Sequence, residues 1–197
     1  MLRKLVKLFS KRQETRMFIV HLNVRVQPLD RGEIFEDVLD AEIRKLHLGE
    51  VTGGGTALTA DGEIESCDIE IDLNRYDDDA MKALQSILKQ LPVPKGSKII
   101  DGNTDEEIPI GELEGLALYL NGSDLDSEVY ETCDANHVYT ELYRLTEGTG
   151  VVLSHWQGKS ETGLYLYGKS FKKMNDQIAS FIETYPLCQK CRVEKIA

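Results

Sequence analysis

The sequence carries one pattern of elements twice, from about Met17 to Asp101 and again from about Leu116 to Ile196. Each half is predicted to run strand, helix, glycine-containing turn, two strands, helix and closing strand. The register is clearest between residues 80–92 and 174–186, where most apolar positions coincide and a proline occupies the same last position. An internal repeat constrains the architecture more than any single motif, because both copies must build the same unit.

The first half contains the residue patterns of two helices and four strands. Apolar and polar side chains alternate over residues 18–27, as in a strand with one buried face. The three glycines at 53–55 precede a strand and lack the lysine of a phosphate loop, so they indicate a bulge or a flexible hairpin entry. The expected elements are strand 18–27, helix 34–46, hairpin strands 53–59 and 63–73, helix 80–91 and strand 98–100.

The second half repeats this order after an acidic linker. In the linker, Ile108, Ile110 and Leu113 indicate that the segment packs at least partly against the body. The expected elements of the second half are strand 116–120, helix 135–145, hairpin strands 151–156 and 163–167, helix 171–185 and strand 191–196. The chain therefore divides into a basic leader (1–16), a first half (17–101), a linker (102–115) and a second half (116–197).

This order of elements is typical of the ferredoxin-like α+β unit, in which a four-stranded antiparallel sheet carries both helices on one face. The expected fold is a tandem duplication of that βαββαβ unit. A half of about 85 residues has only a small core, and its bare sheet face favours one pseudo-symmetric body over two separate domains. Two arrangements remain open, in which the open faces pack together or the sheets join edge to edge.

The charge is strongly acidic and unevenly distributed. The net charge is −11, of which the first sixteen residues contribute +5 and the remaining chain −16. Such a body repels nucleic acid at long range and favours a basic protein as partner, although an acidic surface also serves solubility alone. The sequence has no membrane-spanning run, no signal peptide and four cysteines without disulfide-scaffold spacing, which predicts a cytoplasmic protein.

The segment from Met1 to Arg16 has the pattern of a short basic amphipathic helix, with Leu2, Leu5 and Phe9 at helical spacing. It could dock on the acidic body or form a frayed extension, and Met17 could equally serve as the start of translation. Contact with an anionic membrane surface is the less favoured reading, because one short helix without a lipid anchor binds weakly.

The open face of the first predicted sheet is the main candidate site. If the apolar residues of strand 63–73 face the helices, its carboxylates point the other way and lie beside the polar residues of the first strand. Such a face suits a basic ligand, a cation or a basic loop of a partner, and the alternative is a solvated face with one ion pair worth about 0–1 kcal/mol. Alternate residues on a strand lie about 7 Å apart, too far to converge on one metal ion. The candidate residues are His21, Asn23, Arg25, Asp68, Glu70 and Asp72.

A second candidate lies in the hairpin of the second half, where His155 and Trp156 face Tyr165 and Tyr167 on the returning strand. Tryptophan and tyrosine dominate binding hot spots, so this cluster could be a recognition surface. Most aromatic side chains on sheets are buried, which favours packing.

Cofactor chemistry has little support in the sequence. Cys188 and Cys191 have the spacing of half a zinc site, but no second pair of ligands is present and the pair follows a helix rather than opening one. His137 lies at a helix start, where Asp134 or Asn136 is more simply a cap. No cofactor and no metal are expected.

The function most consistent with these patterns is a non-enzymatic, acidic protein-binding module. No nucleophile motif and no arguable acid and base pair supports an enzyme. In charge and size alone the chain resembles bacterial toxin immunity proteins, which implies an inhibitor that neutralises a basic partner. The alternative is a small-molecule-binding or sensor module with a pocket between the two halves. A closed polar pocket would favour the ligand, and an exposed polar sheet face would favour the protein partner.

Overall fold

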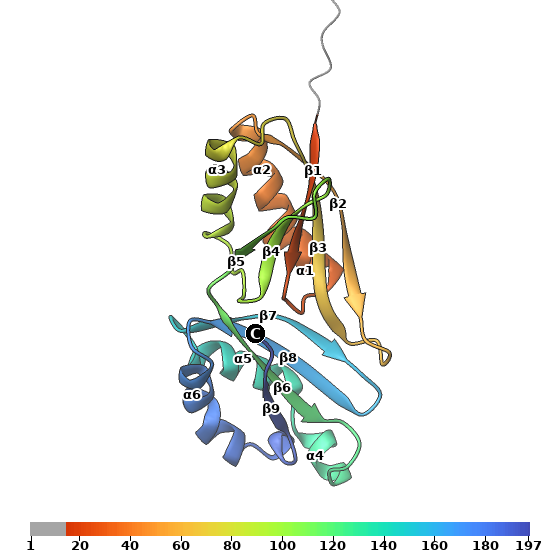
Figure 1. Ribbon diagram of the computed structural model, residues 1–197. Coiled ribbons are helices and arrows are strands. Elements are labelled where there is room, and N and C mark those ends of the chain that lie inside the picture. The colour runs from red at the N-terminus through yellow and green to blue at the C-terminus, as the bar shows by residue number, and fades with distance from the viewer. Residues whose placement is uncertain (1–14) are drawn as a thin grey trace, which may run out of the picture.

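Two α+β units stacked end to end make up the computed structural model, which describes residues 15–197 (Figure 1). Residues 1–14, most of the predicted leader, lie outside the described residues. The first unit consists of β1 (Arg16–Leu22), a helical run formed by α1 (Pro28–Arg31), the π-turn η1 (Gly32–Glu36) and α2 (Asp37–Lys45), β2 (Gly49–Leu58), β3 (Ile64–Leu73), α3 (Asp78–Leu88), β4 (Ser97–Asp101) and β5 (Glu107–Ile110).

The second unit follows β5 after three residues. It consists of β6 (Glu114–Asn121), α4 (Ser127–Thr132), α5 (Ala135–Leu145), β7 (Gly150–Gln157), β8 (Glu161–Gly168), α6 (Phe171–Thr184), the 3-10 turn η2 (Pro186–Cys188) and β9 (Arg192–Lys195). None of the helices in residues 15–197 has the length and apolar character that crossing a membrane would need.

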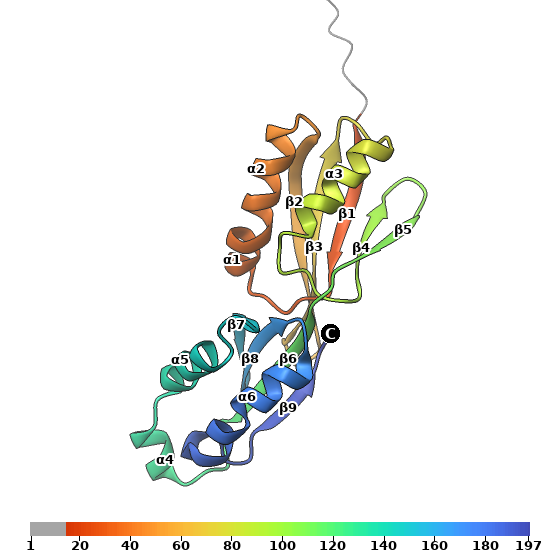
Figure 2. The same cartoon turned by 90° about the vertical axis from the view of Figure 1, so that its left-hand side faces the viewer.

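Both sheets are antiparallel and share one strand order. The first runs β2-β3-β1-β4-β5 and the second β7-β8-β6-β9, so the four strands of each repeat occupy equivalent places. In each unit the long helices lie on one face of the sheet (Figure 2). This is the ferredoxin-like topology, and the prediction of a duplicated α+β fold is confirmed.

The elements that were not predicted include β5 and α4. β5 adds a fifth strand to the first sheet from within the predicted linker, and Ile99 pairs with Ile108 along it. Pro109 is tolerated there because β5 is an edge strand and needs no further donor at that position. The short helix α4 precedes α5 and packs through Val129 against the second core.

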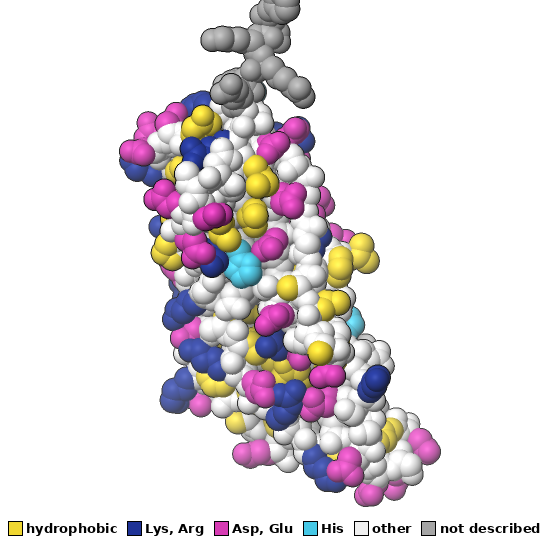
Figure 3. Space-filling model, turned by 45° about the vertical axis from the view of Figure 1, so that its right-hand side comes forward, with side chains coloured by type: hydrophobic (Ala, Val, Ile, Leu, Met, Phe, Trp, Pro, Cys, Tyr) yellow, Lys and Arg dark blue, Asp and Glu magenta, His cyan; other side chains and the backbone are white. Residues whose placement is uncertain are grey.

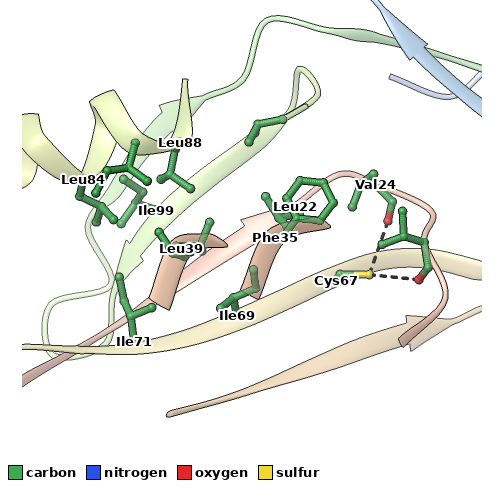
Figure 4. Close-up of a cluster of buried hydrophobic side chains, with 14 of the residues drawn as sticks. Leu22, Val24, Phe35, Leu39, Cys67, Ile69, Ile71, Leu84, Leu88 and Ile99 are labelled. Atoms are coloured by element: carbon green, nitrogen blue, oxygen red, sulfur yellow. Dashed lines mark hydrogen bonds between the residues drawn. The ribbon is translucent and has the colours of Figure 1, made fainter. Parts of the chain in front are cut away.

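Each unit has its own apolar core between sheet and helices. In the first unit, alternate residues of β3 such as Ile69 and Ile71 pack against Leu39 of α2 and Leu84 of α3 (Figure 4). The second core is built the same way, and its buried residues include Leu116, Leu118, Val138, Leu142, Leu166, Met174 and Ile178.

The first strand is shorter than the alternation predicts. The β1 pairing with β3 ends at Leu22, although Val24 and Val26 are also fully buried. Beyond Leu22 the backbone donors bond to side-chain hydroxyls: the N–H of Arg25 donates to Tyr167 Oη at 2.8 Å and that of Gln27 to Ser154 Oγ at 3.0 Å. The predicted strand over 18–27 was therefore too long, because its last residues are held by the second unit and not by the sheet.

The units meet where the open face of the second sheet covers one end of the first unit. Tyr165 and Tyr167 are at most 1% exposed and belong to one buried cluster with Val24 and Val26. The open face of the first sheet takes no part in this cluster. The sheets thus neither face each other nor share an edge, so a symmetric fold is joined by asymmetric contacts. We call this contact region the seam.

Candidate functional site

The open face of the first sheet carries the predicted carboxylates. Ile69, Ile71 and Leu73 of β3 are buried against the helices, so the side chains between them point to the other face. The strand register places Ile19 opposite Glu70 and His21 opposite Asp68. On β2 and β3 its acidic residues are Glu50, Asp68, Glu70 and Asp72, and on β4 and β5 the face carries the ion pair of Lys98 and Glu107. We call this surface the acidic face.

Few of its charges are neutralised. His21 Nδ1 lies 2.7 Å from Asp68 Oδ1, and Glu50 pairs with Arg44 at 2.9 Å. Within residues 15–197, the carboxylates of Glu70 and Asp72 have no ion-pair partner. Exposed pairs of this kind contribute about 0–1 kcal/mol each. Because Glu70 and Asp72 are not paired within the described residues, the face remains negative and solvated.

The middle of the acidic face is apolar. Ile19 and Ile100 pair across β1 and β4 and point away from the helices, and both are only half-buried. Figure 3 shows apolar and acidic side chains interspersed over the first unit. An apolar centre with a charged rim is the anatomy of a protein interface.

Two predicted members of this site lie elsewhere. Asn23 donates its side-chain amide to the carbonyl oxygen of Lys95 at 2.8 Å, beside the loop before β4. Arg25 was expected among Asp68, Glu70 and Asp72, but its guanidinium pairs with Glu63 in the seam. The cause is the departure of the chain from the sheet after Leu22, which turns the next polar side chains toward the second unit.

Glu63 is the centre of a polar cluster in the seam. One of its oxygens accepts hydrogen bonds from Arg25, from Tyr119 Oη at 2.5 Å and from Tyr165 Oη at 2.8 Å. The guanidinium of Arg192 stacks on the Tyr119 ring, 3.5 Å from its centre. Burial and the hydrogen bond to Glu63 raise the pKa of Tyr119 to about 12. Burial likewise raises the pKa values of Tyr165 and Tyr167, so all three phenols stay protonated: Tyr119 and Tyr165 donate to Glu63, and Tyr167 accepts from the Arg25 N–H.

The aromatic candidates of the second unit are used inside the molecule. Tyr165 and Tyr167 are buried in the seam and present no surface to a partner. Trp156 Nε1 donates to the carbonyl oxygen of Gly62 at 3.0 Å. The carbonyl oxygen of His155 accepts from the side-chain amide of Gln27 at 2.9 Å, and the imidazole of His155 is exposed. The two tyrosines therefore serve packing, as the second interpretation expected. The indole of Trp156 forms a hydrogen bond between the two units.

The cysteine pair lies in an apolar environment. Burial and the neighbouring Cys191 and Cys133 raise the pKa of Cys188 to about 12, the opposite of what a reactive thiol needs. The fold brings Cys133, which is isolated in sequence, close to this pair. Within residues 15–197, no three histidine, cysteine or acidic side chains form a group that could hold a metal ion.

Sequence reasoning did not find Glu63 and Tyr119. Glu63 follows a turn and has the pattern of an ordinary strand entry, so only its spatial neighbours distinguish it. Tyr119 did carry a signal: Leu118 and Leu120 pack on the helix side, which places the residue between them on the open face.

Comparisons with known proteins do not assign the chain to a family. No family model matches the chain, and no curated protein matches its sequence. A monooxygenase-like protein from Fusobacterium nucleatum aligns with 92% of this chain and 90% of its own, at 12% identity and a TM-score of 0.30. The regulatory subunit of aspartate kinase from Thermus thermophilus aligns over 84% and 92%, at 10% identity and a TM-score of 0.26.

The first two RRM domains of the yeast poly(U)-binding protein align over 92% of this chain and 99% of their own, at 13% identity and a TM-score of 0.24. Likenesses this distant carry no argument about what this chain binds or catalyses.

Proposed function

We propose that this protein is a non-enzymatic binding module that receives a basic protein surface on its acidic face. One observation carries the proposal: the open face of the second sheet is buried in the seam, whereas the equivalent face of the first is uncovered and charged. Within residues 15–197, Glu70 and Asp72 have no ion-pair partner that would compete with a bound basic surface.

Charge complementarity is the physical reason for choosing a basic partner. The −16 carried by residues 17–197 attracts a basic protein and speeds its association. On contact, Ile19 and Ile100 supply apolar area while the surrounding carboxylates accept lysine or arginine donors. An inhibitor that neutralises a basic toxin is the specific form of this proposal, and charge and size support it.

The alternative, a ligand pocket enclosed between two facing sheets, is less well supported. His21, Asp68 and Glu70 lie on an uncovered face, and the space in front of the second sheet is filled by Val24, Val26 and neighbouring side chains. The polar groups that would line such a pocket are therefore not brought together.

The test compares two variants with the same change of charge. The full chain, immobilised, is used to capture proteins from an extract of the source organism at low and high salt. The variant D68N/E70Q/D72N removes three charges from the acidic face, and the control D126N/E128Q/E131Q removes three exposed charges around α4.

We expect a basic protein that binds the wild type and the control alike, loses at least about tenfold in affinity with the acidic-face variant, and dissociates as salt rises. Equal loss in both variants would show that only net charge matters. Capture of no basic protein at low salt would overturn the proposal.

A further inference from the structure

A groove of about 480 Å³ lies at the junction of the two units, away from the acidic face. It runs between the C-terminal end of α3, β5 and the residues that follow β5, and Lys169 of the β8–α6 loop reaches it from the second unit. This volume is within the range of small-molecule sites, about 300–1,000 Å³. No residue of the acidic face lines it.

The floor of the groove is apolar. Leu88 and Val93 are buried, at 2% and 3% exposure, and they are the deepest of the lining side chains. Leu91, Ile110 and Leu113 are half-buried around them. Such a surface contacts a hydrocarbon or aromatic group favourably, because each buried CH₂ removes apolar area from water.

The backbone around the floor is held in place. The N–H groups of Glu112 and Leu113 both donate to the carbonyl oxygen of Val93, at 3.1 and 3.3 Å. Gly111 has a φ of +89°, and a β-carbon there would lie 1.9 Å from the carbonyl oxygen of Pro94. This close approach requires glycine, so the groove is preformed.

The rim carries two of the few basic side chains that have no ion-pair partner within the described residues. Of the 17 basic residues between 17 and 197, 13 form ion pairs within the described residues. Lys89 and Lys169 are two of the other four, and both line the groove. They come from different units, Lys89 from the end of α3 and Lys169 from the β8–α6 loop. Glu112 also lines the groove and is exposed.

We propose that this groove binds a small amphipathic carboxylate, with its apolar body on the floor at Leu88 and Val93 and its charge between Lys89 and Lys169. The two lysines attract an anion, which the acidic surface elsewhere would repel. With Glu112 the charged side chains of the groove sum to +1, which favours a singly charged carboxylate over a doubly charged phosphate monoester. The proposal goes beyond the protein-binding function and uses none of its residues.

The test titrates the full chain with decanoate and measures affinity by calorimetry and by amide shifts in NMR spectra. We expect binding in the micromolar to millimolar range and shifts confined to 85–93, 109–113 and 169. Decanol and decylamine, which keep the tail but not the negative charge, are expected to bind at least about tenfold more weakly. Butyrate, which keeps the charge but little of the tail, is expected to bind as weakly.

Three variants make the test specific. K89Q/K169Q is expected to weaken decanoate binding at least about tenfold. K159Q/K173Q removes the other two unpaired lysines, which lie outside the groove, and is expected to leave the affinity unchanged. E112Q removes the opposing charge and is expected to bind a few-fold more tightly.

The proposal is overturned if decanoate does not bind up to a few millimolar, if both lysine pairs have the same effect, or if decylamine binds as well as decanoate. The acidic-face variant D68N/E70Q/D72N is expected to bind decanoate normally. The two proposals can therefore fail independently.

Discussion

The open faces of the two sheets have the same place in the same topology and opposite environments. The second carries Ala117, Tyr119, Tyr165 and Tyr167 and is buried, whereas the first carries His21 and a row of carboxylates and is solvated. The strand order does not decide which face is covered, because the four repeated strands have the same order in both units. The covering of a face is decided by the residue types at every second position of its two central strands, which are β1 and β3 in the first unit and β6 and β8 in the second. A duplicated scaffold can thus use one face to hold its two units together and leave the other exposed to solvent.

The largest expected effect comes from breaking the buried face. Y167A removes a side chain that is 1% exposed, and we expect it to lower the free energy of unfolding by about 3–5 kcal/mol. The matched change on the other face, I19A, removes a half-buried side chain and should cost about 1 kcal/mol. Urea denaturation of both variants measures the difference. Equal losses would mean that the two faces do not differ energetically.

The next effect concerns the polar centre of the seam. E63Q leaves Arg25 without its carboxylate and weakens the acceptor for Tyr119 and Tyr165, so we expect a loss of about 2 kcal/mol. A double-mutant cycle with Y119F measures how much of this loss the two residues share. Strict additivity of the two changes would contradict a cooperative cluster.

A pH titration measures the contribution of Tyr119 to the stability of this cluster. The pKa of Tyr119 is raised in the folded protein to about 12, from an ordinary value of 10.0. The stability that this phenol contributes is therefore complete below about pH 10 and is lost as pH rises from about 10 to about 12, because the unfolded chain releases the proton first. Urea denaturation at pH 9, 10 and 11 should give a falling free energy of unfolding. Lysines titrate in the same range, so the comparison is with Y119F, whose decline should be shallower.

The smallest effect is expected on the acidic face. D68N/E70Q/D72N changes exposed or half-buried side chains of which only Asp68 has an ion-pair partner within the described residues, so stability should stay within about 0.5 kcal/mol of wild type. The apparent melting temperature and the denaturation midpoint measure this. A large loss would show that these carboxylates serve the fold, and would remove the reason to assign them to a partner.

Much of the fold could be predicted because periodicity is local. Alternation in residues 63–73 correctly assigns Asp68, Glu70 and Asp72 to one face and Ile69 and Ile71 to the other. The repeat correctly predicts the order of the four repeated strands in each sheet, since an order of elements repeated in sequence is built twice in space, but it does not predict β5.

The seam could not be predicted because its causes are not local. Alternating burial continues to Val26, although the hydrogen-bond partners of the segment change after Leu22 from a neighbouring strand to hydroxyl groups more than 120 residues away. Arg25 was misplaced for this reason. A strand leaves a period of two in the sequence. The contact between the second sheet and the end of the first unit leaves only a choice of residue types, such as the tyrosines of β6 and β8.

The backbone hydrogen bonds of Arg25 and Gln27 have a consequence for folding during synthesis. Their N–H groups find acceptors at Tyr167 and Ser154, which are synthesised well over a hundred residues later. A buried amide without an acceptor is costly, so the end of the first unit that carries Val24 and Val26 cannot settle while the chain is still short. Domains generally fold in turn as they leave the ribosome. We therefore expect the end of the first unit that carries Val24 and Val26 to pack only once the second unit has been synthesised.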